Sequence, residues 1–311
     1  MSNAGRPGVQ YTEYSRLVMQ TPFLSVWSYR SQEYEVGRPA VVRTAAGDHE
    51  FWLDRTDPLL NTILPGTALS VVVNLGDTWA AGRTLVSTEV IPAFCVMGPV
   101  TRPRVMCVGP TVYAVGAVLP AAFAMDVLSC PPADLVDRTV PLDALWPRHR
   151  IHELLDAVCR GDDASRAARL RDVLLASTTM TRPADVTATA ARLMTLRGGD
   201  VSVEAMAARC ALSRQQFTRR FRAATGLPPK QFARISRFQR LVHTLLTTDV
   251  ERWAVEARAS GFYDQSHMVN EFREFAGASP TRFFRPRGRE LGPPEEGRLR
   301  GRPHTWWGST E

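Results

Sequence analysis

The sequence predicts an α+β protein with more than one domain: a mostly β N-terminal part, a helical linker and an all-α C-terminal part. Three observations lead to this prediction. Short β-prone runs separated by Pro and Gly fill residues 9–146, helical spacing of apolar residues begins near Ile151, and one apolar pattern occurs twice after residue 200. At 311 residues, the chain is long enough for about two domains of ordinary size.

The order of these parts gives the expected domain bounds. The β domain is predicted over residues 1–147, and a helical linker over residues 148–199 ends at a Gly pair that would stop a helix. The linker helices either form the interface of a homodimer or pack within the monomer. Residues 200–285 form the helical C-terminal domain, and the Pro/Gly/Arg-rich residues 286–311 are expected to be disordered.

Composition and charge favour a globular protein with a polyanionic partner. Hydrophobic residues make up 44% of the chain, charged residues 22%, and the net charge is +7. The apolar stretch Thr111–Met125 is shorter than the roughly 20 residues of a spanning helix, and Pro120 divides it. We therefore expect a buried strand that runs into a short helix there, and no membrane partner.

The cysteines and the N-terminus indicate a cytoplasmic protein. The five cysteines are odd in number and never spaced as Cys-x-x-Cys, which disfavours a disulfide framework or a zinc knuckle. The first residues lack the basic and then apolar pattern of a signal sequence.

The C-terminal domain contains two copies of one helical unit. The pattern apolar-x3-apolar-x4-Gly-x2-Pro-x2-Phe occurs twice, 51 residues apart, first at Phe217, Phe221, Gly226, Pro229 and Phe232 and then at Met268, Phe272, Gly277, Pro280 and Phe283. In each copy a short polar side chain is expected to cap the second helix: Ser213, with Gln216 as its capping-box partner, and Asp264. A helix over Lys230–Leu246, about 25 Å long, is predicted to join the copies.

The helix after Ser213 has two chemically different faces. Phe217 and Phe221 share one face at 100° per residue, while the opposite face carries Gln and Arg side chains, which can bond adenine and guanine bidentately. A single copy could also be an ordinary helical hairpin with a solvated face. Nine Lys/Arg against one acid over residues 201–240 favour DNA. The predicted base-reading residues here are Gln215, Thr218, Arg219 and Arg222.

Further cations are expected to bind phosphate, and those on the joining helix either do so or form a solvated face. The predicted phosphate-binding residues are Arg214, Arg220, Lys230, Arg234, Arg237 and Arg240.

The second copy is net acidic, with three Arg against five acids over Val250–Pro280. The helical wheel places Glu271 beside the core face, and Asp264 is the expected N-cap. The groove face then carries Ser266, His267, Asn270 and Arg273. We therefore expect the first unit to anchor through charge and the second to add weaker discrimination.

Two long stretches carry a family resemblance. MAARCALSRQQFTRRFRAATGLPPKQFARISRFQRL and ASGFYDQSHMVNEFREFAGASPTRFF, within Val201–Phe284, resemble the AraC/XylS family of bacterial transcription regulators. The resemblance implies a double helix-turn-helix that binds double-stranded operator DNA, and RNA polymerase as a further partner. It implies base contacts from Gln215, Thr218 and Arg219 in the first unit and from Gln265, Ser266, His267, Val269 and Asn270 in the second.

The sequence departs from the family pattern at three positions. Asn270 stands where Arg is common, so adenine reading could replace a guanine contact, and Glu256 stands where an apolar residue is usual. Ala211 replaces the usual Gly of the turn, which costs backbone energy if its φ is positive.

The N-terminal part resembles, through motifs such as ILPGTALSVVVNLG and YAVGAVLPAAFAMDVL, an uncharacterised sensor domain of some family members. Sugar-sensing members carry a cupin-like β-barrel, so such a barrel is one expectation. Because residues 1–148 contain only His49 and no nucleotide or nucleophile motif, we expect no enzyme, cofactor or metal site. The aromatic residues Trp27, Trp52, Trp79 and Tyr113 either line a pocket for an apolar small-molecule effector or simply fill the core.

Three functional hypotheses follow. The chain is a one-component regulator with an effector-sensing β domain, an effector-independent dimeric or architectural DNA-binding protein, or a regulator switched by Cys95 and Cys107. The last requires exposed thiols, whereas both cysteines lie in apolar runs. In the tail, Arg298–Pro303 (RLRGRP) resembles the core of a minor-groove-binding hook, a match that also arises by chance.

Overall fold

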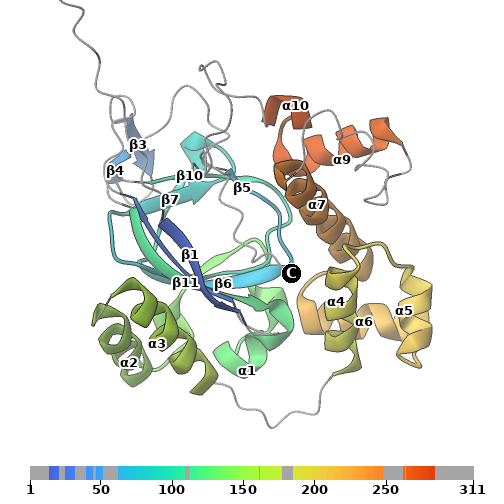
Figure 1. Ribbon diagram of the computed structural model, residues 1–311, viewed down its shortest axis with the longest axis horizontal. Helices are drawn as coiled ribbons and strands as arrows, with labels where there is room; N and C mark the ends of the chain where they lie inside the picture. The colour runs from blue at the N-terminus through green and yellow to red at the C-terminus, as the bar shows by residue number, and fades with distance from the viewer. Residues whose placement is uncertain are drawn as a thin grey trace, which may run out of the picture.

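The computed structural model has a β-rich part beside a helical part (Figure 1). It describes residues 14–20, 25–31, 40–44, 47–51, 62–108, 112–160, 162–176, 185–247, 262 and 264–283. The predicted order of a β-rich N-terminal part followed by a helical C-terminal part is confirmed. The hook-like segment of the tail, Trp52 and Glu256 lie outside the described residues.

The described strands form two antiparallel sheets and a separate hairpin. The larger sheet has the order β1 (Tyr14–Gln20), β2 (Ser25–Ser31), β11 (Val112–Pro120), β6 (Ala68–Asn74), β9 (Phe94–Met97) and β12 (Thr139–Pro141). The smaller has the order β5 (Thr62–Ile63), β10 (Arg104–Cys107), β7 (Trp79–Gly82) and β8 (Glu89–Ile91), and the hairpin pairs β3 (Ala40–Thr44) with β4 (Gly47–Phe51).

The central strands β6 and β11 of the larger sheet are buried on both faces, which explains their continuous apolar runs. Successive side chains of a strand point to opposite faces. In β6, Val71 and Val73 pack in one core cluster with the helices, and Val72 packs in another with the smaller sheet. In β11, Val115 faces the helices and Ala114 faces the smaller sheet. Alternation of polar and apolar residues is therefore absent from these strands.

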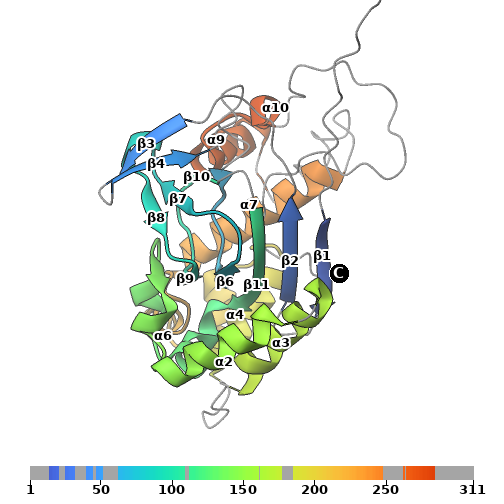
Figure 2. The ribbon, with the colours of Figure 1, turned by 90° about the vertical axis from the view of Figure 1, so that its left-hand side faces the viewer.

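Helices α1 (Ala124–Leu128), α2 (Arg148–Cys159) and α3 (Asp163–Ala176) cover one face of the larger sheet (Figure 1), and Figure 2 shows α2 and α3 from their own side. The strand over Val112–Pro120 does run into a short helix, as predicted, through a 3-10 turn at Ala121–Phe123. Further 3-10 turns are η2 (Leu85–Ser87), η4 (Pro132–Leu135) and η5 (Leu142–Ala144). Buried Trp146 fixes the layer because its Nε1 donates to the carbonyl of Val127 at 3.0 Å.

The helical part consists of short helices around a phenylalanine-rich core. Its described helices are α4 (Val186–Leu196), α5 (Val203–Arg209), α6 (Arg214–Thr225), α7 (Pro229–Thr247), α9 (Gln265–Ala276) and α10 (Pro280–Phe283). Four fully buried phenylalanines, Phe217, Phe221, Phe238 and Phe272, belong to this core. In the described residues, no helix is long and apolar enough to cross a membrane.

Helix α4 packs into this helical core, although its sequence was expected to belong to the linker. Ala190, Ala191 and Met194 are buried among the phenylalanines. The Gly pair after α4 makes this possible, since Gly198 and Gly199 have φ of 56° and 71°. The expected linker therefore packs in two places, with α2 and α3 on the sheet and α4 on the helices.

The two parts meet along a contact made by a few residues of the β-rich part. Leu64 is 3% exposed and belongs to the core cluster of the helical part, and Val136 packs against the same cluster. A Cβ at Gly226, where α6 ends, would lie 2.7 Å from Val136 Cγ2 and 2.8 Å from the oxygen of Pro132. The end of α6 thus lies directly against η4.

Candidate nucleic-acid interface

Helix α6 begins at a capping box, as the sequence predicts. The backbone N–H of Gln216 donates to Ser213 Oγ at 3.2 Å, and the N–H of Ser213 donates to Gln216 Oε1 at 3.1 Å. The helix ends at Gly226, whose φ of 79° suits a residue without a side chain. Local sequence therefore sets both ends of this helix.

The turn before α6 holds a residue in an unfavourable backbone conformation. Ala211 has a φ of 52°, so the replacement of the family's usual Gly does meet a positive φ. The turn is nevertheless closed, because the N–H of Leu212 donates to the carbonyl of Ala207 at 3.0 Å.

One face of α6 is buried and the other carries the predicted base-reading residues. Phe217 and Phe221 are fully buried, with ring centroids 5.4 Å apart. Gln215, Arg219 and Arg222 are exposed, and Thr218 is half-buried. This face is therefore open to a ligand in the described structure.

Helix α9 repeats the arrangement. Its N-cap is Asp264, whose Oδ1 accepts the N–H of His267 at 2.7 Å, and it ends at Gly277 with a φ of 75°. Met268, Phe272 and Phe275 are buried. The predicted base-reading residues of this unit, Gln265, Ser266, His267, Asn270 and Arg273, are all exposed.

The two remaining acids of α9 point to α7. Arg234 Nε donates to Glu271 Oε1 at 2.7 Å, and Arg234 Nη2 donates to Glu274 Oε2 at 2.6 Å. The hydrogen bond with Glu274, followed by that with Glu271, raises the pKa of Arg234 above its usual value. Arg234 is one of the predicted phosphate-binding residues. In this structure its guanidinium holds two carboxylates, which gives the acidic side chains of α9 a cationic partner on α7.

The other predicted phosphate-binding residues differ in their surroundings. Arg237 lies over the ring of Phe262, 5.8 Å from its centroid, and Arg240 runs alongside Gly198. Arg214 forms an exposed ion pair with Glu204 at 3.2 Å, a kind of contact that contributes little and is easily exchanged. Arg220 and Lys230 are exposed, and neither has an ion pair among the described residues.

The structure does not bring the predicted effector residues together. Trp79 is 1% exposed and packs between the two sheets. Tyr113 lies on the other face of the larger sheet, where Arg166 of α3 stacks over its ring and donates to its hydroxyl. Trp27 is placed only by its strand, in register with Gly116. Trp79 and Tyr113 therefore cannot line one pocket.

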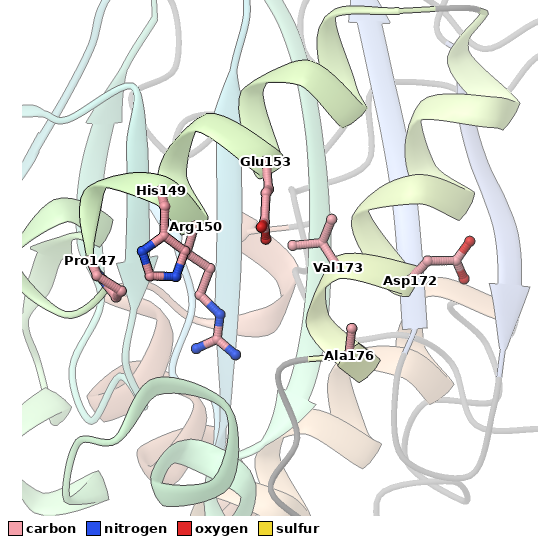
Figure 3. A pocket seen from close by; sticks show the side chains of 7 residues that line it. All are labelled: Pro147, His149, Arg150, Glu153, Asp172, Val173 and Ala176. Atoms are coloured by element: carbon pink, nitrogen blue, oxygen red, sulfur yellow. The ribbon is translucent and has the colours of Figure 1, made fainter.

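Two other hollows occur in the described structure. A cleft of about 500 Å³ opens between α2 and α3 (Figure 3), and it is lined by Pro147, His149, Arg150, Glu153, Asp172, Val173 and Ala176. A second hollow, of only about 40 Å³, lies where Leu64, Met97 and Val100 approach Gln239 of α7. Sequence patterns did not indicate either hollow, because the first depends on how α2 and α3 pack and the second combines residues that are distant in the chain.

The two central cysteines of the β-rich part are buried. Burial raises the pKa of the Cys95 thiol to about 12 and that of Cys107 to about 11. Thiols of this kind are poor nucleophiles near neutral pH. Among the described residues, no group of His, Cys, Asp and Glu side chains is arranged to hold a metal ion.

A comparison with known protein families finds a match in the helical part. Residues 206–286 match a family model described as a helix-turn-helix domain. No curated protein sequence matches the chain significantly.

Several solved structures are similar to parts or most of the chain. The C-terminal domain of AraT, a response regulator from Geobacillus stearothermophilus, is 17% identical and covers 38% of this chain and 98% of its own, with a TM-score of 0.32. ToxT from Vibrio cholerae with bound unsaturated fatty acid is 9% identical and covers 85% and 96%, with a TM-score of 0.43. The AraC-like transcriptional activator CuxR is 14% identical and covers 80% and 83%, with a TM-score of 0.25.

Proposed function

We propose that this chain is a one-component transcription regulator in which α6 and α9 each read a segment of operator DNA. The proposal starts from its C-terminal part, which is an AraC-type helix-turn-helix domain. Such a regulator acts in the bacterial cytoplasm and has double-stranded DNA as its first partner. RNA polymerase and a second copy of the chain are further partners in this proposal.

One observation carries it: two capped helices of 12 residues each present an exposed polar face opposite a buried apolar face. They are connected through α7, whose 19 residues span about 28 Å. Successive major grooves on one side of B-DNA lie about 34 Å apart. A helix of this length can separate two readers that enter successive grooves of one duplex.

The direct test is Arg219→Ala. Arg219 is exposed on α6, and a bidentate Arg–guanine contact is worth about 1–3 kcal/mol of discrimination. We expect weaker binding and relaxed specificity at one base pair, measured by fluorescence anisotropy on a duplex that the wild-type chain selects from a random pool.

The matched control is Arg160→Ala, which removes an exposed cation in the β-rich part. It should leave sequence preference unchanged. Unaltered specificity in Arg219→Ala would show that the assigned reading register is incorrect.

We further propose that the β-rich part senses an apolar small molecule and shifts the population of the DNA-competent arrangement. The packing of Leu64 and Val136 against the helical core supports this, because a change in the β-rich part would be felt by the helices that bind DNA. The catalytic alternative receives no support from the helix-turn-helix match, and we propose no enzymatic activity.

A thermal-shift screen of the full chain against metabolites tests the sensing proposal. A ligand that binds only the folded state raises the melting temperature, and an effector must also change operator affinity. If no compound does either, the effector-independent dimeric or architectural protein is the better description. The thiol-switched alternative is disfavoured by the burial of Cys95 and Cys107; an oxidant response that is lost when both are replaced by Ser would reinstate it.

A further inference from the structure

We infer that Arg234 is a positioning residue: by holding Glu271 and Glu274 it fixes α9 against α7 and so sets the DNA spacing that α6 and α9 read together. The inference rests on the proposed function and deepens it. The clamp is defined here as Arg234, Glu271 and Glu274.

The clamp joins two helices that are far apart in sequence. Its partners are 37 and 40 residues from Arg234 in the chain. The guanidinium carbon also lies 5.0 Å from the centroid of the Phe275 ring, so one side chain contacts three residues of α9. A planar guanidinium donates along fixed directions, which gives such a contact angular definition as well as energy.

Two aromatic contacts also join α7 and α9. Phe238 lies 5.4 Å from Phe272 and 5.2 Å from Phe275, measured between ring centroids. Apolar burial is strong but has no preferred direction. The aromatic contacts therefore hold the helices together, while the clamp fixes how far α9 is rotated about its axis.

Rotation of α9 matters because its reading residues alternate with the clamp carboxylates. Asn270 directly precedes Glu271, and Arg273 directly precedes Glu274. Neighbouring residues on a helix are separated by about 100°, so Glu271, held toward α7, leaves Arg273 on roughly the opposite side and Asn270 at the flank. Glu274, four residues after Asn270, lies at the edge of the reading face. The same bonds that hold the acids thus aim the reading face.

Glu271 makes the arrangement sensitive to loss of Arg234. It is 5% exposed, and its second carboxylate oxygen, Oε2, has no hydrogen-bond partner within the described residues. A buried carboxylate without its cation is unfavourable, so α9 must move to hydrate Glu271 when Arg234 is absent. Glu274 is the milder site to change, since 58% of its side chain is exposed.

The experiment measures spacing preference. A duplex that the wild-type chain selects from a random pool is remade with single base pairs inserted or deleted between its half-sites, and the dissociation constant is measured on each. The observable is the dissociation constant at the shifted spacing divided by that at the original spacing. General electrostatic effects change both constants by the same factor and therefore cancel in the ratio. We expect Arg234→Met to lower this ratio by about tenfold, and Glu274→Gln, at the more exposed partner, to lower it by about threefold.

These two substitutions change the net charge in opposite directions. A shared effect on spacing therefore cannot come from attraction to phosphate. Arg220→Met is the matched control, because Arg220 is an exposed cation on α6 outside the clamp. It should weaken binding equally at all spacings and reduce the salt dependence of log K by about 0.9.

A DNA-free readout separates failure of the inference from failure of the proposed function. Hydrogen–deuterium exchange of the full chain should be faster in α9 of Glu274→Gln and Arg234→Met, and unchanged in α6. If Arg234→Met weakens and Glu274→Gln tightens binding equally at every spacing, Arg234 is a phosphate ligand and the inference is overturned. If the wild-type chain selects no sequence, the proposed function fails, and unchanged exchange in α9 would overturn the clamp as well.

Discussion

Ala211 occupies a backbone conformation that side-chain-bearing residues rarely adopt, with a φ of 52° just before α6. A positive φ costs such a residue about 1–2 kcal/mol relative to glycine. We expect Ala211→Gly to raise the free energy of unfolding by about 1 kcal/mol, measured by urea denaturation. Ala205→Gly within α5 is the control and should lower it by about 1 kcal/mol. Destabilisation by both would mean that the turn carries no strain.

Because the thiol of Cys95 is buried, we expect the free energy of unfolding to decrease at alkaline pH. The folded chain keeps Cys95 protonated up to a pKa of about 12, whereas the usual value is 9.0. Because the pKa is raised on folding, the stabilisation is complete below the lower value and is lost as pH rises between the two. We expect the free energy of unfolding to fall more steeply above about pH 9 in the wild type than in Cys95→Ala. Equal slopes would contradict a buried, protonated thiol.

At the scale of elements, Ala substitutions at Gly199 and Gly277 distinguish the cost of backbone strain from the cost of close packing. Both have positive φ, but a Cβ at Gly199 would lie 2.0 Å from the carbonyl oxygen of Ala233, while a Cβ at Gly277 meets nothing within 4 Å. Gly277→Ala should therefore cost about 1 kcal/mol, and Gly199→Ala about 2–4 kcal/mol because α4 must move from α7. Urea unfolding followed by circular dichroism measures both. Equal losses would show that the contact with Ala233 is easily relaxed.

Elements whose ends depend on nearby residues were predictable from sequence. Ser213 and Asp264 cap their helices by hydrogen bonds to residues three positions later, so a local pattern was enough. The partner of Glu271 was not predictable, because Arg234 lies on another helix and no spacing rule links residues so far apart. The helical wheel places Glu271 beside the core face, and only the fold shows which cation meets it there.

For the whole molecule, sequence indicated the class of each part but not how the parts combine. The order of the larger sheet places β11 between β2 and β6, a long-range pairing that no local signal specifies. The apolar runs of β6 and β11 indicated buried strands, but α2 and α3 were assigned to a linker because their helical period says nothing about the surface they cover. The predicted effector residues illustrate this best, since Trp79 packs between the two sheets while Tyr113 lies on the other face of the larger sheet, against α3.

The contact between the parts limits how freely they can be recombined. Leu64 and Val136 belong to the β-rich part in sequence, yet they complete the core around the helices. A chimaera that grafts the helical part onto another N-terminal domain would leave an unfilled apolar recess where these two side chains pack. Such a graft must include residues equivalent to Leu64 and Val136. The contact surface between the two parts, as well as the domain boundary in the chain, therefore decides which segment can be transferred.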